Sequence, residues 1–472
     1  MPDTPETPDE PIEPDPEVEQ RAHAELRSVE AELNQRWGET KIAPTIQRIT
    51  ALLNMVGDPQ HNYPVIQVAG TNGKGSVVRM IEGLLTRMGL RVGRFTSPHL
   101  QLVTERISVD GVPISASTYV DSYRDLEPFI GMVDDARAPD APRMTKFEVL
   151  SAMAFSVFAD APVDVAVLET GMGGTWDATN VAEAQVAAIT PVSLDHREYL
   201  GDDLVSIARE KAGVIGKEGV AVLAEQEPDA LRTLLERAVE VDAAVARAGQ
   251  EFGVLRREKG VGGQQLSLQG LGGVYDDIFL PAHGEHQAAN AALALAAVEA
   301  FFGAGKGRQL VIEAIREGFA ELELPGRLEP VRGAPTVLLD AAHNPHAARA
   351  LATAIDAEFA FRRLVAVVAV LDDKDVTGIL EAIEPVVSDI VVTTNSSPRA
   401  VPPERLAEIA RPIFGEDRVH VSPRLDSAVE AAVTLVEHTD DPEEPLAGGG
   451  VLITGSVVTA GEARALFGKE PA

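Results

Sequence analysis

The stretch Gly70-Thr71-Asn72-Gly73-Lys74-Gly75-Ser76 has the composition of an anion-binding turn. Glycines let a backbone curl so that successive N–H groups point into one concavity, and a helix that follows adds its positive N-terminal end. Lys74 would place a mobile positive charge on the outer phosphates of a nucleotide. The usual phosphate-loop formula, G-x-x-x-x-G-K-[ST], fits imperfectly, because Gly75 separates Lys74 from the hydroxyl of Ser76. A glycine turn with a solvated lysine is the alternative.

Further polar residues lie where apolar runs end: Ser97, Glu169, His196, Asp340 and His343. In open parallel sheets ligands bind beyond the carboxyl ends of the strands, so this common placement predicts one site. A buried carboxylate such as Glu169 is costly without a partner, and magnesium on a nucleotide prefers a few oxygen ligands plus phosphate oxygens. Bonds to local backbone are the alternative for Glu169, and a core or surface position is the alternative for His196.

Other polar residues have two interpretations from the sequence alone. Lys211 lies on a predicted helix, and its spacing favours a side chain that snorkels to solvent. Asn344, which follows His343, suits either a ribose or phosphate contact or a plain helix cap. Asn290 and Arg327 are candidates for binding a base and a phosphate, although surface roles are more usual for such residues.

Strands that alternate with helices carry these residues. Apolar runs predict strands at 65–69, 90–96, 164–169, 186–191, 220–224, 337–340, 364–370, 390–394 and 451–454. Helical spacing is found at 20–37, 77–85, 147–158, 204–214, 229–241, 286–302, 346–358, 376–383 and 403–409, and before residue 322. Two more strand–helix units are expected after residue 409, and they end with the strand at 451–454 and a helix from residue 458. Residues 104–109 alternate like a further strand, and residues 252–281 predict a hairpin or small antiparallel edge. We therefore expect an α/β protein with mostly parallel sheets covered on both faces.

The chain of 472 residues is too long for one ordinary core. Residues 1–18 are acidic and proline-rich, with too little apolar content to offset the entropy of ordering, and predict a disordered tail. Leu324-Pro325-Gly326-Arg327 predicts a hinge, after which the alternation of strands and helices restarts. The expected organisation is a tail over 1–18, a nucleotide-binding domain over 19–324 and a smaller domain over 325–472.

The composition excludes several classes of function. A net charge of −32 would repel polyanions, so neither nucleic acid nor an anionic membrane is expected as a partner. The absence of cysteine excludes disulfides, thiolate metal sites and a cysteine nucleophile. No apolar run is long enough for a membrane span, and the amino terminus lacks the features of a signal peptide, so the cytoplasm is the expected compartment.

A series of motifs resembles, in order, those of the folylpolyglutamate synthase family, including its bifunctional dihydrofolate synthase form, within the Mur ligase superfamily. The motifs are Gly70–Ser76, Thr96–Leu100, Glu105–Ile107, Asp177–Asn180, Leu194–His196 with Leu200-Gly201, Glu210–Gly213, Pro325–Arg327 and Asp340–Pro345. The resemblance runs from residue 40 to residue 465, and an ordered set of this size is far more specific than any single loop.

The resemblance implies an ATP-dependent amide ligase that adds L-glutamate to a folate or to dihydropteroate. An N-terminal phosphate-loop domain would act with a smaller Rossmann-like C-terminal domain that closes over the site. The acceptor carboxylate would take the γ-phosphoryl group to form an acyl phosphate, which the glutamate amine then attacks. Cations must offset the repulsion between the anions, so ATP would bind with Mg2+ at two sites, and a monovalent cation is a further candidate. A monomer is expected.

The resemblance also implies roles for individual residues. Contacts to ATP are implied for Thr71, Asn72, Gly73, Lys74, Gly75, Ser76, Asn290, Arg327, Asp340 and His343. Magnesium ligands are implied for Ser97 in place of Ser76, for Glu169 and His196, and for Lys211 if it is carbamylated like the family's lysine, which reverses its interpretation from spacing. Substrate contacts are implied for Arg106, Lys374, Ser456 and Asp177. The catalytic candidates are Lys74, Lys211, Asp340, His343 and Arg106.

One position departs from the family pattern, and two rival functions stay open. Thr175 stands where the family commonly has arginine, so a neutral hydroxyl replaces a guanidinium group that is always charged. A cell-wall Mur ligase, joining an amino acid to a nucleotide-linked muramyl peptide, shares fold and mechanism but usually has lysine followed directly by threonine or serine. A P-loop NTPase switch would hydrolyse ATP without an acceptor and need not contain the second sheet domain.

Overall fold

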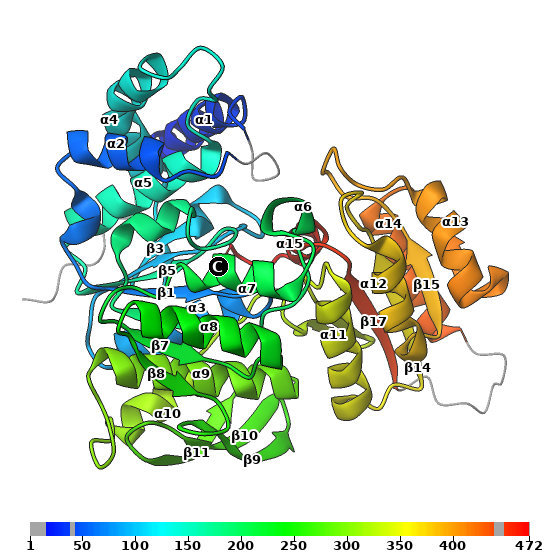
Figure 1. The fold of residues 1–472 in the computed structure, drawn as a ribbon. Coiled ribbons are helices and arrows are strands. Elements are labelled where there is room, and N and C mark those ends of the chain that lie inside the picture. The colour runs from blue at the N-terminus through cyan, green and yellow to red at the C-terminus, as the bar shows by residue number, and fades with distance from the viewer. Residues whose placement is uncertain (1–15, 38–42, 439–447, 472) are drawn as a thin grey trace, which may run out of the picture.

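Two α/β domains form the protein in the computed structural model, which describes residues 16–37, 43–438 and 448–471. Figure 1 shows the larger N-terminal domain on the left and the smaller C-terminal domain on the right. Helix α10 of the first domain ends at Ala320, and strand β12 of the second begins at Glu329. The boundary that we propose at residue 325 lies in the connection between them. Most of the tail expected over 1–18 lies outside the described residues, and residues 16–18 instead open helix α1.

An eight-stranded sheet forms the centre of the N-terminal domain, in the order β4-β3-β2-β5-β1-β6-β7-β8. Its strands are β1 (Val65–Ala69), β2 (Val92–Phe95), β3 (Ile107–Val109), β4 (Val112–Pro113), β5 (Val165–Glu169), β6 (Val186–Ile189), β7 (Val220–Leu223) and β8 (Ala244–Arg247). All pairings between β2 and β8 are parallel, whereas β3 and β4 add an antiparallel edge. Strands β1, β5 and β6 are buried at every position, which explains their nearly continuous apolar sequences.

Helices cover both faces of this sheet. They are α1 (Pro16–Leu33), α2 (Gln47–Met55), α3 (Lys74–Arg87), α4 (Ala116–Asp135), α5 (Lys146–Asp160), α6 (Arg197–Leu200), α7 (Leu204–Ala212), α8 (Pro228–Glu240), α9 (Glu285–Phe301) and α10 (Ile312–Ala320). Successive residues of β1 serve opposite faces, because Ile66 joins the cluster under α3, α9 and α10 and Val65 joins the cluster under α1, α2, α4 and α5.

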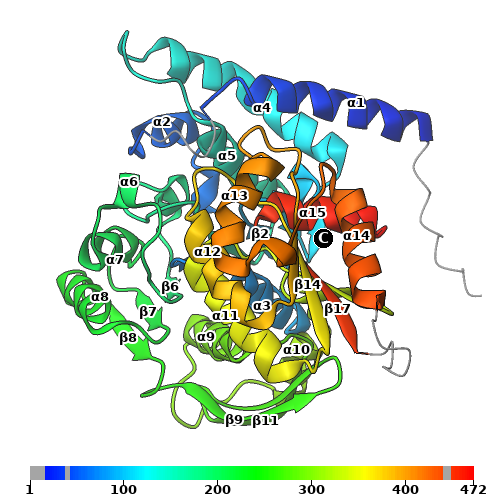
Figure 2. The ribbon, with the colours of Figure 1, turned by 90° about the vertical axis from the view of Figure 1, so that its right-hand side faces the viewer.

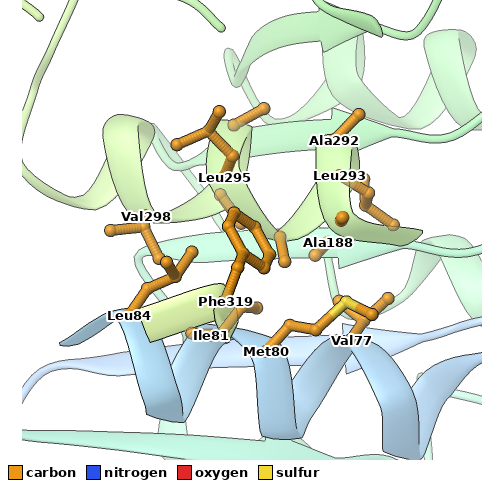
Figure 3. Packing of buried hydrophobic residues seen from close by; sticks show 14 of the residues in the cluster. Val77, Met80, Ile81, Leu84, Ala188, Ala292, Leu293, Leu295, Val298 and Phe319 are labelled. Carbon is orange, nitrogen blue, oxygen red and sulfur yellow. The ribbon is translucent and has the colours of Figure 1, made fainter. Parts of the chain in front are cut away.

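Helix α3 is held firmly under the phosphate loop. Val77, Ile81 and Leu84 recur at helical spacing and are fully buried. They face Leu295 of α9 and Phe319 of α10, as Figure 3 shows. This packing fixes the helix whose first turn carries Lys74.

The expected hairpin over 252–281 is a three-stranded antiparallel sheet in the order β11-β10-β9. Its strands are β9 (Gly253–Gly260), β10 (Gly263–Gln269) and β11 (Val274–Leu280). It lies beside α9 and α10, at the bottom of Figure 1. Leu266, Leu268 and Ile278 bury its inner face in the same cluster as α3.

The C-terminal domain has a six-stranded sheet in the order β12-β13-β17-β14-β15-β16. Its strands are β12 (Glu329–Gly333), β13 (Thr336–Leu339), β14 (Arg363–Val368), β15 (Asp389–Val392), β16 (Val419–Val421) and β17 (Gly449–Thr454), all parallel except β12. Its helices are α11 (Pro345–Glu358), α12 (Val376–Ile383), α13 (Pro403–Phe414), α14 (Leu425–Glu437) and α15 (Val457–Leu466). Separate clusters on the two faces pack against α11, α12 and α13 and against α14, and Figure 2 shows this domain facing the viewer.

The predictions from the sequence did not include α2, α4, α6, β4, β8 or β12, and the prediction of a strand over 104–106 was wrong. Those residues form a 3₁₀ turn, η2 (Val103–Arg106), because the Glu105 carboxylate accepts backbone N–H groups from 100–102 and curls the chain. Helix α4 does carry a signal, since Tyr119, Tyr123 and Ile130 are buried at helical spacing. None of the helices in the described ranges is long and apolar enough to cross a bilayer.

Candidate active site

A cavity of ≈ 620 Å³ opens beyond the carboxyl ends of β1, β5 and β6, where the two domains meet. Every residue for which the sequence implied a role lines this cavity, with the exception of Lys211. The N-terminal domain contributes residues 71–76, Ser97, Arg106, Glu169, Asp177, His196 and Asn290. The connection and the C-terminal domain contribute Arg327, Asp340, His343, Lys374 and Ser456. Residues almost four hundred positions apart in the sequence therefore share one site.

The phosphate loop needs glycine at two positions. Gly70 has φ +139°, and a Cβ there would lie 1.9 Å from Thr190 Oγ1. Gly73 has φ +88°, and a Cβ there would lie 2.9 Å from Asn290 Oδ1. Gly73 also caps α3 without a side chain, so the first N–H groups of the helix face the loop as anion donors.

Some side chains of the loop face the cavity, and others bind neighbouring segments of the protein. Lys74 Nζ donates to the Thr71 carbonyl at 3.1 Å and lines the cavity. Thr71 Oγ1 exchanges hydrogen bonds with the backbone of Ser193, at 3.1 and 3.0 Å, and so ties the loop to the segment after β6. Ser76 is buried, and its hydroxyl accepts from Gln287 Nε2 at 3.4 Å. The lysine is thus the cationic group that the loop offers to a phosphate.

Glu169, the last residue of β5, lies buried beside the loop. Its Oε2 accepts the N–H of Ser97 at 3.2 Å, and burial raises its pKa although Lys74 opposes the shift. A buried carboxylate needs a cation, so Glu169 and the Ser97 hydroxyl have the oxygen chemistry of a magnesium site. Among the residues that the structure describes, no three His, Asp or Glu side chains converge on one point. A magnesium ion held here would therefore take further ligands from nucleotide phosphates.

His196 has the protonation state of a metal ligand. It precedes α6 with φ +50°, a conformation uncommon for a residue with a Cβ, and its N–H donates to Asp195 Oδ1 at 2.9 Å. Burial lowers the pKa of His196 to about 4. The imidazole is neutral at pH 7, and the neutral form is the one that binds metal ions.

Lys211 is buried, which corrects the expectation from spacing that it snorkels to solvent. Its Nζ donates to the Gly70 carbonyl at 2.7 Å, behind the phosphate loop. Burial and the charge of Lys74 lower the pKa of Lys211 to about 7. The side chain is therefore partly neutral at pH 7, and a neutral amine is the form that adds CO2 to give a carbamate.

Thr175, at the position where arginine was expected, fastens the loop after β5 to α7. Its Oγ1 donates to the Glu210 carbonyl at 3.2 Å. A Cβ on Gly213 would lie 2.2 Å from this Oγ1, so the two backbones are in close contact. The hydroxyl thereby supports the last turn of α7, one residue from Lys211.

The C-terminal domain contributes an acid and an imidazole to the cavity. Asp340 follows β13, and its carboxylate accepts N–H groups from Leu328 and Ala342, both at 2.9 Å. Burial raises the pKa of Asp340, with Arg327 opposing. His343 Nδ1 donates to a backbone carbonyl at 3.0 Å, which leaves Nε2 as an acceptor, and burial lowers its pKa.

Two expected substrate contacts present cations to the cavity. Lys374 comes from the loop before α12, with Nζ 3.5 Å from Asp373 Oδ2. Arg106 ends η2 on the opposite domain, and its Nε donates to His99 Nδ1 at 2.9 Å. Both domains therefore direct positive charge at the same space, which suits an anionic substrate.

Ser456 and Asp177 line the cavity with polar groups that already have partners. The Ser456 hydroxyl caps α15, accepting from Thr459 N at 3.0 Å and from Asn395 Nδ2 at 3.1 Å. The Asp177 carboxylate accepts from Met172 N at 2.9 Å and caps a 3₁₀ turn, and burial raises its pKa. Both side chains are fixed in place by the fold before any substrate arrives.

Sequence reasoning missed an apolar end of the cavity, lined by Phe147, Met172 and Trp176. A Cβ on Gly171 would lie 2.6 Å from Phe147 Cζ, so this aromatic ring lies directly over the backbone after β5. The available signal was the capping box of Thr145 and Glu148, which places Phe147 in the first turn of α5. His286 of α9 and His346 of α11 also line the cavity and were not predicted from the sequence.

Comparisons with known proteins agree with this architecture. The family model described as the Mur ligase middle domain matches residues 68–298, and that described as the Mur ligase, glutamate ligase domain matches residues 326–456. The phosphate loop lies in the first match, and Asp340, His343 and Lys374 lie in the second. The fold and the site thus define an ATP-dependent ligase of the Mur ligase fold.

The similarity extends along most of the chain. A dihydrofolate synthase/folylpolyglutamate synthase of Mycobacterium tuberculosis is 55% identical over 462 residues, 95% of each chain, and one of Escherichia coli is 36% identical over 363 residues, 77% of this chain and 80% of that protein. The structure of M. tuberculosis folylpolyglutamate synthase complexed with ADP has a TM-score of 0.91 at 55% identity, covering 96% of this chain and 100% of that one. E. coli FolC in complex with DHPP and ADP has a TM-score of 0.81 at 31% identity, covering 95% and 98%. The chain belongs to the dihydrofolate synthase/folylpolyglutamate synthase family.

Proposed function

We propose that this protein uses ATP to join L-glutamate to a folate, and that dihydropteroate is a second acceptor. The observation that carries the proposal is the single cavity in which the phosphate loop with Lys74 faces Lys374 and His343 of the other domain. The relatives named for both activities and the solved complexes with ADP and DHPP support it. A cell-wall ligase and a simple NTPase are the rivals that the experiment below must distinguish.

In the first proposed step, a carboxylate oxygen of the acceptor attacks the γ-phosphorus of ATP and ADP leaves. Lys74 and the N-terminal N–H groups of α3 hold the phosphates and stabilise the transferring group. Lys374 and Arg106 offset the charge of the approaching carboxylate. Asn290 and Arg327, which line the same cavity, are the proposed contacts for the remaining parts of the nucleotide.

In the second proposed step, the glutamate amine attacks the acyl carbon, phosphate leaves and the nitrogen loses a proton. The attacking amine must be neutral, so a nearby base aids the step. His343 and Asp340 are the candidates, since His343 presents an unprotonated Nε2 and burial raises the pKa of Asp340, which makes its carboxylate a stronger base. Arg106 would hold a carboxylate of the incoming glutamate.

Ser97, Glu169 and His196 are the proposed magnesium ligands, with Lys211 joining them as a carbamate at a second site. When bound, magnesium would neutralise the β- and γ-phosphate oxygens. A carbamate would change Lys211 from a cation behind the loop into an anion, which suits a position close to a divalent ion. A monovalent cation stays a further candidate.

The apolar end of the cavity is the proposed place for the pteridine ring of the acceptor. Phe147 and Trp176 offer flat apolar faces, and Asp177 offers a buried carboxyl group to ring nitrogens. The acceptor would then reach from this end toward Lys74 with its carboxylate. We propose that the protein acts as a monomer, and in the cytoplasm.

The deciding experiment follows ADP release with candidate acceptors, with and without L-glutamate. We expect turnover that requires both glutamate and either tetrahydrofolate or dihydropteroate, assayed side by side. Turnover dependent on a muramyl nucleotide would overturn the proposal in favour of a cell-wall ligase. ADP release that needs no acceptor would overturn it in favour of an NTPase.

A further inference from the structure

The loop that carries Ser97 packs against helix α15 of the C-terminal domain. This loop, residues 97–102, connects β2 to η2 within the N-terminal domain. Its outer side meets α15, where a Cβ on Gly461 would lie 1.8 Å from the Leu100 carbonyl oxygen. The helix backbone therefore touches the loop backbone, and no residue larger than glycine fits at 461 without a shift.

Arg464 completes this contact one turn along the same face of α15. Its Nε donates to Gln101 Oε1 at 2.9 Å, Nη1 pairs with Glu329 at the start of β12, and Nη2 donates to the Glu470 carbonyl at 2.6 Å. Gln101 Nε2 donates in turn to the Lys469 carbonyl at 2.9 Å. One buried guanidinium thus joins the loop, the strand after the hinge and the carboxyl-terminal segment.

The loop is also stiff on its inner side. The Glu105 carboxylate accepts N–H groups from Leu100, Gln101 and Leu102, at 2.8, 3.0 and 2.9 Å. A displacement at Gln101 is therefore shared by its neighbours rather than absorbed by one flexible bond. Ser97 lies at the other end of this short segment, where its N–H contacts Glu169.

We propose that Arg464 is a positioning residue that couples docking of the C-terminal domain to the placement of Ser97. Arg464 lines a second cavity and is not among the residues that line the first. Its effect on the reaction is assigned to Gln101 and the loop, because Gln101 is the residue of the N-terminal domain to which Arg464 donates. This inference rests on the proposed function of Ser97 as a magnesium ligand.

The test compares Arg464→Met with Arg363→Met in the full chain. Arg363 also pairs with a carboxylate, Asp389 at 2.8 Å, but this pair is less buried than that of Arg464 and lies wholly within the C-terminal domain. Hydrogen exchange of the nucleotide-free protein should become at least fivefold faster in peptides covering 97–102 for Arg464→Met, with strands β14 and β17 unchanged. The control should leave 97–102 within twofold of wild type.

Calorimetry of AMPPCP binding then measures the magnesium requirement without any turnover. We expect the MgCl2 concentration for half-maximal enhancement of binding to rise at least fivefold in Arg464→Met and in Gln101→Leu. Gln101→Leu removes the contact from the other domain, so it tests the coupling even if Arg464→Met fails to fold. The double variant should show no further rise in the magnesium requirement, because both substitutions break the Arg464–Gln101 contact through which the coupling passes.

Two results would overturn the coupling: loop exchange within twofold of wild type, or faster exchange with an unchanged magnesium requirement. Neither measurement depends on folate ligation. If the wild-type protein failed to join glutamate to a folate while these shifts were observed, the proposed function would fall and the coupling would stand.

Discussion

Asn72 of the phosphate loop and Asn344 of the C-terminal domain pair amide to amide across the domain interface. Asn344 Nδ2 donates to Asn72 Oδ1 at 2.9 Å, and Asn72 Nδ2 donates to Asn344 Oδ1 at 3.2 Å. The same Asn344 oxygen caps α11 by accepting the N–H of Ala347 at 2.9 Å. The Asn344 side chain therefore binds both the first turn of α11 and the phosphate loop, and this contact joins the two domains.

Replacing Asn344 with serine should separate these two functions. Serine is also a good helix cap, but it cannot form the two amide hydrogen bonds to Asn72. Their loss should cost about 1–2 kcal/mol of interaction free energy between the two domains. We expect AMPPCP to bind about tenfold more weakly by calorimetry, with a melting temperature close to that of wild type. Ser115→Ala, which removes the cap of α4 far from the cavity, should lower stability and leave nucleotide affinity unchanged.

Removing the charge of Lys74 should impair phosphoryl transfer more than folding. For Lys74→Met we expect kcat/KM for ATP to fall by about 10²–10³-fold, the usual effect of losing one transition-state contact. The exposed Lys217, paired with Glu218 at 3.4 Å, provides the matched control Lys217→Met, which should retain full activity. Equal activities of the two variants would refute the role of Lys74.

The buried amine of Lys211 should make carbamylation depend on pH. Because burial depresses its pKa to about 7, the neutral amine that reacts with CO2 becomes the main form above pH 7. We expect 13C NMR with labelled bicarbonate to show a carbamate signal that grows as pH rises through 7 and is absent in Lys211→Ala. Short-chain carboxylates should partly restore the activity that Lys211→Ala loses, and absence of both effects would argue against a carbamate.

The lowered pKa of Lys211 also makes the free energy of unfolding depend on pH. The unmodified folded protein binds fewer protons than the unfolded chain between pH 7 and the ordinary lysine pKa near 10.5, so its stability rises with pH across that window. Denaturant titrations in CO2-free buffer should show this slope, and Lys211→Met should reduce it. An unchanged slope would place the titrating group elsewhere.

His196 should stay neutral throughout the physiological pH range. Burial lowers its pKa to about 4, so its ring signals in NMR spectra of the metal-free protein should shift only below pH 5. Loss of those signals in His196→Gln assigns them. The variant should also need roughly tenfold more MgCl2 for half-maximal AMPPCP binding, by analogy with losses at other metal sites. A midpoint near 6.5 would contradict the lowered pKa that we expect for this half-buried ring.

Glu358 should determine whether the two domains unfold together. It ends α11, and its buried carboxylate pairs with Arg257 of β9, contacts His283 Nδ1 at 2.9 Å and accepts Gly284 N at 2.7 Å. Removing one partner of such a group costs about 3 kcal/mol. Glu358→Ala should split the calorimetric unfolding transition in two. Asp389→Asn, within the C-terminal domain, should lower the stability of that domain without splitting the transition further.

Local sequence was sufficient to predict that several polar side chains lie together at one edge of a sheet. Lys74, Glu169, His196 and Asp340 follow apolar runs, and parallel strands present their carboxyl ends at one edge of a sheet. The sequence also predicts a hinge near Pro325, because the alternation of strands and helices restarts after it. Helix α4 was not predicted, although Tyr119 and Tyr123 have helical spacing and are buried.

Only the tertiary structure decided how the two halves of the site meet. A helix cap is one of the two interpretations of Asn344 that the sequence allowed, because capping is a local contact, but its pairing with Asn72 joins residues 272 positions apart. The burial of Lys211 likewise depends on the Gly70 carbonyl from another segment, so helical spacing alone gave the opposite answer. Contacts between domains depend on how complete surfaces fit together, and no periodicity along the chain records that fit.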